Sequence, residues 1–393
     1  MAGSLEKRGK NSWRLEVNAG VDANGKYIRK RKTVTARNKT EAKELLQEFS
    51  VQVRKGEYVA PTGITLNEFV PVWRKERIKE IAPNTMETYD YAFNGRILPA
   101  IGHYKLDKIK PLDIKNLVTN IEKEGLASSS IAKVYNALNN LFKFAIENDV
   151  LQNNPMDKVK RPKVTYKKGQ VYGTEELNKL YHLLNEEENK QMALLVKTAL
   201  LTGMRKGELL GLQWHDVDVA NNIIRIRHTL TYTKETGYLL KSPKTNDSVR
   251  QVAPPKGLMK ELRKHIQRKR EEKNMAAEMW ESGFGNLVFS TYGHNKENKM
   301  TMFGKPLHQD SPNRWWRRFI KRINKDREDK IKQIRFHDLR HTAATVLINK
   351  NENTDAISKR LGHADIRVTS SIYSHYFNEA DQRLADSLDE DYI

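Results

Sequence analysis

Two histidines and an arginine lie close together in the stretch HDLRHTAAT, residues 337–345. On a helix, His337, Arg340 and His341 stand at positions i, i+3 and i+4, so their side chains share one face. A histidine pair at this spacing can begin a zinc site, whereas a histidine beside an arginine can bind a phosphate group. The rest of the chain decides between these two kinds of site.

A zinc site is the weaker interpretation. The zinc helix of metalloproteases reads His-Glu-x-x-His, with the glutamate next to the first histidine as general base. Here an aspartate takes that place, and Arg340 would put a fixed positive charge beside the metal. No further group of residues with metal-ligand spacing stands out in the sequence. We therefore expect no metal cofactor.

A phosphate site has more support, because the same C-terminal block supplies further groups for it. Arginine is always charged, and its planar fork matches two phosphate oxygens. Phosphoryl transfer depends mainly on positioning and on neutralising the charge of the equatorial oxygens. A second arginine, Arg205, follows a helix break in LLTGMRKGELLGL. Lys244 stands in the turn KSPKTNDSVR, and LGHADIRVTSSIYSHY contributes His363 and, ten residues later, Tyr373.

The charge of the chain indicates a polyanionic partner. Its 393 residues suggest about two or three domains, and 38% of them are hydrophobic, which is enough for substantial cores. The formal net charge of +21 fits nucleic acid or an acidic membrane surface better than a small neutral substrate. Residues 1–60 carry a net charge of +7, whereas residues 351–393 carry −5.

Nothing in the sequence indicates secretion or membrane insertion. The start, MAGSLEKRGKNSW, lacks the apolar core of a signal peptide, and no apolar run approaches the length of a membrane span. There is no cysteine, hence no disulfide and no thiol nucleophile or ligand. These features lead us to expect a soluble protein of the cytoplasm.

The first 60 residues are expected to form a small module of ββα or βββα type. SWRLEVNAGVD and KYIRKRKTVTA have strand character and are joined by an Asn24-Gly25 turn signal. A helix follows, opened by Asn38 with Glu41 three residues later. Its apolar positions recur at helical spacing: Ala42, Leu45, Leu46 and Phe49.

The second strand of this module is basic on both faces. It holds Arg29, Lys30, Arg31 and Lys32 in succession. A two-stranded ribbon fits the major groove of DNA, so we expect these four residues to contact DNA. The alternative is a solvated edge strand that its charges keep from aggregating.

Residues 65–157 are expected to form an all-helical domain of four or five helices. Thr65 with Glu68, and Asn84 with Glu87, are capping-box signals for two of them. The stretch KVKRPKVTYKKG, residues 158–169, then forms a basic linker, either along a DNA backbone or as a plain polar tether. An apolar stripe over four turns, more typical of a core than of a cofactor site, consists of Ile131, Val134, Tyr135, Leu138, Leu141, Phe142 and Ala145.

Residues 170–393 are expected to form a mixed, mostly helical domain with a small antiparallel sheet. Helical patterns cover 174–186 and 190–202 and break at Gly203, before a short helix that contains Glu208. NNIIRIRHTL alternates as one strand, and two further strand-like pieces flank SPKTND. Helices resume near residue 311 and continue toward the end, with an interruption at Gly362.

The order of the candidate residues resembles that of the tyrosine recombinases, and in particular the integrases of phages and conjugative transposons. The residues that carry the resemblance are, in order, Arg205, Lys244, His337-x-x-Arg340, Leu361-Gly362-His363 and Tyr373. The resemblance extends over the whole chain and implies an α+β multidomain fold. By this resemblance, residues 1–60 are an arm-type DNA-binding domain, residues 65–157 a helical core-binding domain, and residues 170–393 the catalytic domain with a C-terminal tail.

The resemblance also implies the reaction. Tyr373 attacks the scissile phosphate and leaves a 3′-phosphotyrosine and a free 5′-hydroxyl. A tyrosine has an ordinary pKa of about 10, so it needs a base or a positive field near neutral pH. The covalent link conserves the bond energy, so neither ATP nor a metal is implied as cofactor. In the remaining implied roles, Arg205 and Arg340 hold the non-bridging oxygens and Lys244 protonates the leaving 5′-oxygen. His337 helps with the proton of the nucleophile, and His363 forms a hydrogen bond with the phosphate.

Some of these assignments have rivals within the sequence. Lys241 competes with Lys244, which is preferred because PKT matches the hairpin of the family. Tyr376 competes with Tyr373 from the same helix face, and the family pattern of tyrosine followed by Ser/Thr-His favours Tyr373. Other residues are expected to support the site: Glu208 as a buried partner that orients Arg205, and His341 and His375 as structural residues.

The resemblance implies a strand transferase that acts on double-stranded DNA as a homotetramer. Two DNA-binding modules ahead of the catalytic domain suggest that one chain bridges arm-type and core-type sites during integration and excision of a mobile element. A directionality factor and a host DNA-bending protein are candidate partners, because bending must bring these sites together. Two other functions stay open: a non-catalytic DNA-binding regulator, and a type IB topoisomerase that relaxes plasmids without a cognate site.

Overall fold

A computed structural model describes residues 3–21, 26–55, 58, 63–165, 169–241, 250–295, 300–350 and 352–362. The chain divides into two compact units, Met1–Tyr166 and Lys167–Ile393. Among the described helices, none combines the length and the apolar character needed to cross a membrane. The expected residues that lie outside the description are the Asn24-Gly25 turn, Lys244, His363, Tyr373, His375 and Tyr376.

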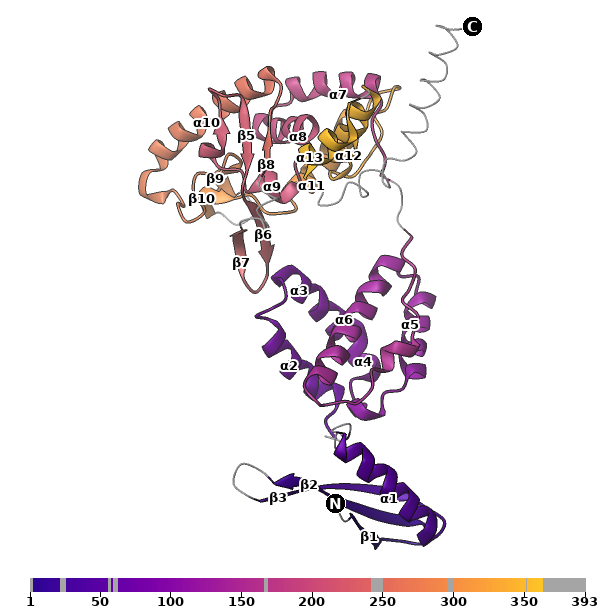
Figure 1. Ribbon diagram of the computed structural model, residues 1–393. Helices are drawn as coiled ribbons and strands as arrows, with labels where there is room; N and C mark the ends of the chain where they lie inside the picture. Colours follow the sequence, from indigo (N-terminus) through magenta and orange to yellow (C-terminus); the bar gives the residue numbers. More distant parts are fainter. Residues whose placement is uncertain are drawn as a thin grey trace. The chain divides into compact units, whose positions relative to one another are not determined.

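The beginning of the chain forms a three-stranded antiparallel sheet with a helix on one face (Figure 1). Its elements are β1 Gly3–Lys7, β2 Ser12–Val21, β3 Tyr27–Thr35 and α1 Lys39–Arg54. Strand β2 alternates between buried and open positions, so that Trp13, Leu15 and Val17 pack with Ala42 and Phe49 of α1. Of the two expected forms of this module, the βββα form is the one observed.

Helix α1 begins at the expected cap. The side chain of Asn38 accepts a 2.8 Å hydrogen bond from the backbone N–H of Glu41. The carboxylate of Glu41 also bonds back to the chain, but it accepts from the N–H of Arg37 at 2.7 Å. Side chains therefore accept hydrogen bonds from one backbone N–H in the first turn, that of Glu41, and from one just before the cap, that of Arg37.

Strand β3 carries basic side chains on both faces of the sheet, as expected. Arg29 and Arg31 contact the carboxylate of Glu16 at 3.4 and 2.6 Å on the open face. The ammonium group of Lys32 lies on the helix side, 5.9 Å from the centre of the Phe49 ring. The hydrogen bond from Arg31 is the main cause that lowers the pKa of Glu16. One acid thus offsets part of the positive charge of the open face.

The next part of the chain is mainly helical, and its core surrounds α6 Ser128–Glu147. The expected apolar stripe of α6 is buried, except that Tyr135 is partly exposed. Thr65 and Glu68 form the expected capping box, with each side chain bonded to the backbone N–H of the other. The other helices are α2 Leu66–Arg77, α3 Pro83–Ala92, α4 Leu98–Ile101 and α5 Pro111–Lys123, and a π turn, Phe93–Ile97, joins α3 to α4.

The expected capping box of Asn84 and Glu87 is wrong. Helix α3 begins at Pro83, and the residue before it is Ala82, whose side chain has no capping oxygen. Proline suits the first helical position because its φ is already near the helical value and its missing N–H would have no partner there. Asn84 therefore stands inside the first turn, where its carbonyl accepts a 2.8 Å bond from the Thr88 hydroxyl.

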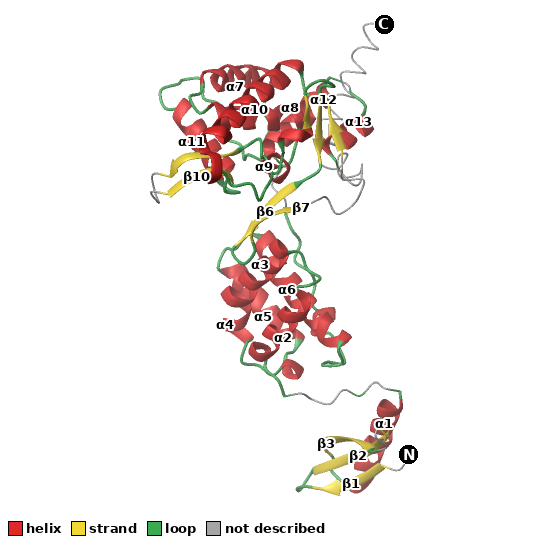
Figure 2. Cartoon of the chain, turned by 90° about the vertical axis from the view of Figure 1, so that its left-hand side faces the viewer, coloured by secondary structure: helices red, strands yellow, loops and turns green. Residues whose placement is uncertain are grey.

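The second unit combines helices with small antiparallel sheets (Figure 2). Helices α7 Thr174–Glu186 and α8 Lys190–Thr202 have the expected bounds. The sequence pattern missed α10 Lys256–Ala276, because its buried face includes the polar residues His265 and Lys269. The remaining helices described here are α9 Lys206–Leu210, α11 Ser311–Ile323, α12 Asp338–Asn349 and α13 Thr354–Leu361.

The stretch NNIIRIRHTL forms two strands, so the expectation of a single strand is wrong. The alternation runs through the break, since Ile224, Ile226 and Leu230 are all buried, and the pattern alone does not reveal the change of partner. The first piece, β5 Ile223–Ile226, pairs with β4 Val217–Asp218 and β8 Arg250–Val252. The second, β6 Thr229–Thr233, pairs with β7 Gly237–Lys241, and a further sheet joins β9 Ser290–Asn295 to β10 Met300–Pro306.

The expected fold class is confirmed by these elements. A small sheet with a helix, an all-helical part and a mostly helical part with small antiparallel sheets follow one another along the chain. Strands β7 and β8 flank SPKTND, as expected, although they belong to different sheets. Figures 1 and 2 both show β6 and β7 as a hairpin that leaves the helical body of the second unit.

Candidate active site

A left-handed turn at the end of α8 places Arg205. Gly203 has a φ of 68°, a conformation that side chains rarely adopt. A Cβ at this position would also lie 2.5 Å from Cδ2 of Leu361 in α13. The chain therefore turns sharply here, and Arg205 becomes the residue that immediately precedes the short helix α9.

The carboxylate of Glu208 holds both the backbone and the side chain of Arg205. It accepts hydrogen bonds of 2.8 Å from the backbone N–H and from the guanidinium of Arg205. Glu208 is only 6% exposed, whereas the side chain of Arg205 is 44% exposed. The expectation of a buried partner for Arg205 is therefore confirmed, and the guanidinium stays within reach of a substrate.

A second arginine shares this carboxylate. Arg250, at the start of β8, donates to the two oxygens of Glu208 at 2.9 and 2.7 Å and is 9% exposed. Burial alone would raise the pKa of Glu208, but the hydrogen bonds and charges of Arg250 and Arg205 lower it to about 2. The carboxylate is therefore ionised throughout the physiological pH range.

The residue before His363 contacts the same arginines. Gly362 ends α13 with a left-handed φ of 70°, and its carbonyl accepts a 2.7 Å hydrogen bond from Arg205. A Cβ on Gly362 would lie 2.7 Å from Nη1 of Arg250. A glycine at this position therefore satisfies both the backbone conformation and the close approach of Arg250.

Arg340 reaches the Gly203 turn from α12. Its side chain is deeply buried, and its Nη1 donates a 2.7 Å hydrogen bond to the carbonyl of Gly203. Arg205 follows the same turn in the chain. The two arginines expected to bind phosphate therefore depend on one turn, the first through chain connectivity and the second through a hydrogen bond.

His337, the residue before α12, and His341, in its first turn, lie side by side, as their spacing predicts. Their ring centres lie 5.3 Å apart in an edge-to-face arrangement. Partial burial of the ring, the neighbouring His341 and the charge of Arg340 lower the pKa of His337 to about 4, although the residue as a whole is exposed. Burial likewise lowers the pKa of His341. Both rings are therefore neutral near pH 7, and a neutral imidazole can accept a proton.

The aspartate of this motif anchors the start of α12. The buried carboxylate of Asp338 accepts from the backbone N–H of Arg335 at 3.1 Å and from its guanidinium at 2.9 and 2.8 Å. Within the ranges that the structure describes, no group of three or more His, Cys, Asp or Glu side chains is placed to hold a metal ion. Asp338 therefore fixes Arg335, two residues before His337, rather than extending a histidine cluster.

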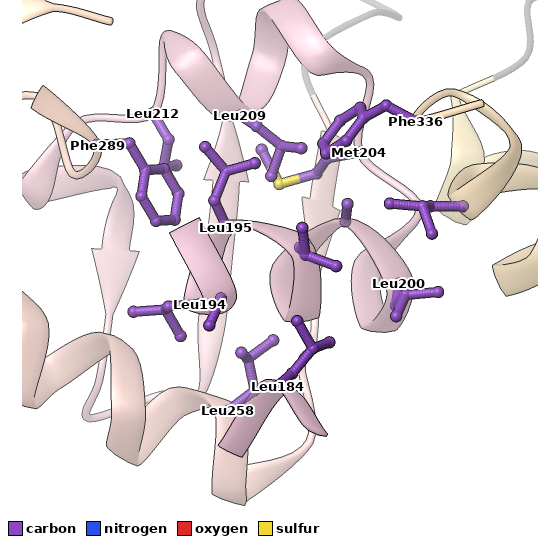
Figure 3. Close-up of a cluster of buried hydrophobic side chains, with 14 of the residues drawn as sticks. Leu184, Leu194, Leu195, Leu200, Met204, Leu209, Leu212, Leu258, Phe289 and Phe336 are labelled. Atoms are coloured by element: carbon purple, nitrogen blue, oxygen red, sulfur yellow. The ribbon is translucent and has the colours of Figure 1, made fainter. Parts of the chain in front are cut away.

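The site rests on the hydrophobic core of the second unit. Met204 and Phe336, the chain neighbours of Arg205 and His337, are buried in one cluster. Figure 3 shows the Phe336 ring beside Met204 and next to Leu209. Because cores are densely packed, a displacement of this cluster would move both site residues.

An open basic cavity of about 630 Å³ borders His337. Its positively charged lining residues are Lys206, Arg317 of α11 and Arg335. None of the side chains that line it, all of them described, is acidic. Such a surface suits the anionic backbone of a nucleic acid.

The structure therefore brings Arg205 and Arg340 to one turn, and it places His337 next in the chain to Phe336, which shares a core cluster with Met204 of that turn. The other three expected catalytic residues lie outside the described ranges. Sequence reasoning missed Arg250, although this residue ends the stretch KSPKTNDSVR. Nothing in the sequence pairs it with Glu208, 42 residues earlier, so only the folded chain reveals the contact.

The sequence of the chain matches the models of known protein families. Residues 171–380, more than half of the chain, match the model described as the phage integrase family. The chain belongs to the phage integrase family. Residues 65–121 of this integrase also match the model of the phage integrase N-terminal SAM-like domain. The integrase is thus a site-specific DNA recombinase of the tyrosine class, which confirms the resemblance drawn from its motifs.

Similar proteins belong to bacteria and their mobile elements. The ICEBs1 integrase of Bacillus subtilis (strain 168) is 27% identical to this integrase over 98% of this chain and 99% of that protein. The transposase from transposon Tn916 of Enterococcus faecalis is 25% identical over 93% of this chain and 84% of that protein.

Solved structures share the fold of this integrase. The Tn1549 transposon integrase, residues 82–397, in complex with transposon right end DNA has a TM-score of 0.64 at 21% identity, over 82% of this chain and 100% of that chain. A lambda integrase tetramer bound to a Holliday junction has a TM-score of 0.54 at 17% identity, over 94% of each chain.

Proposed function

We propose that this integrase cuts and rejoins DNA through a covalent 3′-phosphotyrosine intermediate and thereby integrates and excises a mobile element. The joint dependence of Arg205 and Arg340 on the Gly203 turn carries this proposal. His337, neutral at pH 7, adds a proton acceptor next in the chain to Phe336 of the core cluster. Fixed positive charge and a proton acceptor are what a tyrosine needs to attack an anionic phosphodiester.

In the proposed cleavage step, the phenolic oxygen of Tyr373 attacks the scissile phosphorus while the bond to the 5′-oxygen breaks. The phenolic proton passes to His337, whose low pKa keeps it in the accepting form before attack. Lys244 donates a proton to the leaving oxygen, so the products are a phosphotyrosine and a free 5′-hydroxyl. Rejoining reverses these steps with the 5′-hydroxyl of the partner strand.

Arg205 and Arg340 hold the two non-bridging oxygens in this proposal, and His363 adds a further hydrogen bond. The guanidinium of Arg205 is half exposed and is held by the buried carboxylate of Glu208, which suits a substrate that arrives from solvent. Arg340 is buried, so its charge acts through a medium of lower dielectric constant. Donors fixed in this way need little reorganisation when charge develops on the phosphate.

We also propose that the parts of the chain divide the binding of DNA. Residues 1–60 would bind arm-type sites, residues 65–157 core-type sites, and residues 170–393 the scissile phosphate, with the basic linker 158–169 between them. The exposed guanidinium groups of β3 support the first assignment. The DNA contacts proposed for that strand are those of Arg29, Lys30, Arg31 and Lys32.

The proposed assembly is a homotetramer on double-stranded DNA, which acts in the cytoplasm. The tetramer is supported by the fold shared with lambda integrase, which has been solved as a tetramer bound to a Holliday junction. A directionality factor and a host DNA-bending protein are its proposed partners, because arm-type and core-type sites must be brought together by bending.

A recombination assay tests this function. Purified integrase is incubated with a supercoiled plasmid that carries the joined ends of the element and its target site, and with a plasmid that lacks both. We expect recombinant products only from the first plasmid, and none from the Tyr373→Phe variant. Relaxation of the second plasmid would favour the topoisomerase alternative. Tight binding without any product would favour the DNA-binding regulator.

A further inference from the structure

Arg250 connects segments of the second unit that lie far apart in the sequence. Its guanidinium bonds to Glu208 in α9, and its Nε donates to the carbonyl of Arg360 in α13 at 2.9 Å. Arg360 donates in return to the carbonyl of Ala253 at 3.2 Å and to that of Leu201 at 2.9 Å. These reciprocal hydrogen bonds hold the end of α13 against the segment after β8 and the end of α8.

The carboxylate of Glu208 is shared so that Arg205 depends on Arg250. Oε1 accepts from Nη1 of Arg205 at 2.8 Å and from Nη1 of Arg250 at 2.9 Å. Oε2 accepts from the backbone N–H of Arg205 at 2.8 Å and from Nη2 of Arg250 at 2.7 Å. Removing one partner of a buried ion pair leaves charge without compensation, which favours rearrangement. Without Arg250, the Glu208 carboxylate that fixes Arg205 would therefore be displaced, or its contact with Arg205 would be lost.

We propose that Arg250 is a positioning residue of the recombinase: it holds Glu208 in place to orient Arg205, and it holds α13 so that Gly362 meets Arg205. Arg250 is buried, and each of its three guanidinium nitrogens already donates to Glu208 or Arg360. It therefore acts through Arg205 rather than on the phosphate. This inference rests on the proposed role of Arg205 in binding the scissile phosphate.

The test compares three variants of the full chain. Arg250→Gln removes the charge and the fork, whereas Arg250→Lys keeps a charge without the fork. Arg225→Gln is the matched control, because Arg225 lies on the neighbouring strand β5 and pairs with Asp218 at 2.6 Å instead of Glu208. Thermal melting reports folding, filter binding reports the Kd for core-site DNA, and single-turnover cleavage at saturating protein reports the chemical step.

We expect Arg250→Gln to slow cleavage by about 10- to 100-fold, the usual effect of removing a group that supports a reactive residue. The Kd for DNA should change by less than about threefold, because Arg250 makes no phosphate contact in this proposal. Arg225→Gln should cleave as the wild type does. If Arg250→Gln fails to fold, Arg250→Lys carries the test, with cleavage expected to be slower by about tenfold.

A substrate with a methylphosphonate at the scissile position separates positioning of Arg205 from general damage. This group has a methyl in place of one non-bridging oxygen and carries no charge, so the loss of an arginine should matter less there. We expect the defects of Arg250→Gln and of Arg205→Gln both to shrink on this substrate. Adding Arg250→Gln to Arg205→Gln should cost little more, because the two residues act as one unit.

Three results would overturn this inference while leaving the proposed function intact. They are wild-type cleavage by a folded Arg250→Gln variant, an equal defect on both substrates, or fully additive effects of the two substitutions. Failure of the proposed function looks different, because the wild type itself would then form no covalent product on either substrate.

Discussion

The guanidinium of Arg340 donates a 2.7 Å hydrogen bond to the carbonyl oxygen of Gly203, two residues before Arg205. One turn of the backbone therefore governs both arginines proposed to bind the scissile phosphate. The same turn lies on the core cluster that contains Met204 and Phe336, next to His337 in the chain. Changes at this turn should consequently affect catalysis more than they affect DNA affinity.

Replacement of Gly203 tests this dependence. Gly203→Ala forces a side chain into a left-handed conformation and brings its Cβ to 2.5 Å from Leu361, so we expect a loss of about 1–3 kcal/mol in stability. Single-turnover cleavage should fall with it, because Arg205 and Arg340 both shift. Gly257→Ala is the control, since a Cβ there meets nothing within 4 Å. Equal melting temperatures and cleavage rates for the two variants would refute the role of the turn.

The protonation of His337 gives a prediction on pH dependence. Because its pKa is lowered to about 4, His337 stays neutral in the free integrase above roughly pH 5. The second-order cleavage rate at low protein concentration, which reports on the free enzyme, should therefore show no acidic limb near pH 6.5. His337→Gln should reduce cleavage by about 100-fold or more without moving the profile. An acidic limb near pH 6.5 that disappears in His337→Gln would contradict the low pKa.

The basic cavity beside His337 gives a prediction on DNA binding. If Arg317 contacts a DNA phosphate, Arg317→Gln should reduce the magnitude of the slope of log Kd against log salt by about one unit. Arg314→Gln is the control, because Arg314 is exposed on the same helix but does not line the cavity. Both variants are titrated with core-site DNA over a range of salt concentrations. Identical slopes for the two would place the DNA elsewhere.

Buried His265 should make the stability of the integrase depend on pH. Burial lowers its pKa to about 4, against about 6.5 in the unfolded chain, and its Nε2 lies 2.8 Å from the carbonyl oxygen of Val288. Below pH 6.5 the unfolded chain therefore binds a proton that the folded chain does not, so stability falls as the pH drops toward 4. The loss amounts to at most about 3 kcal/mol for this group.

Thermal melting at pH 7 and pH 5 measures this effect. The melting temperature of the wild type should fall more steeply than that of His265→Gln, which has no imidazole to titrate at this position. The variant should be less stable at pH 7, because it disturbs a packed position of α10. Parallel pH dependence in both proteins would assign the effect to other groups.

Local contacts of this site could be predicted from the sequence, because they join residues close in the chain. Glu208 stands three residues after Arg205 at the start of a short helix, so its carboxylate reaches the N–H of Arg205 as a capping residue does. The rings of His337, which precedes α12, and His341 meet for the same reason. The bounds of α8 also followed from the sequence, since the left-handed Gly203 ends its apolar pattern.

Long-range contacts could not be predicted in this way. Arg250 meets Glu208 only because β8 packs beside α9 and α13, and no periodic pattern encodes that packing. Helix α10 could not be predicted from the sequence pattern, because tertiary contacts bury His265 and Lys269 where the pattern would require apolar residues. The carbonyl of Ser290 accepts a hydrogen bond from Lys269, which explains how a charged residue is accommodated there.

The most direct test of the central claim is a search for the covalent intermediate. The integrase is incubated with a nicked suicide substrate that carries its core site, and the products are separated on a denaturing gel. The wild type and Tyr376→Phe should give a protein–DNA adduct, and Tyr373→Phe should give none. An adduct lost only in Tyr376→Phe would contradict the assignment of the nucleophile. No adduct from a wild type that binds the same DNA tightly would contradict the recombinase mechanism itself.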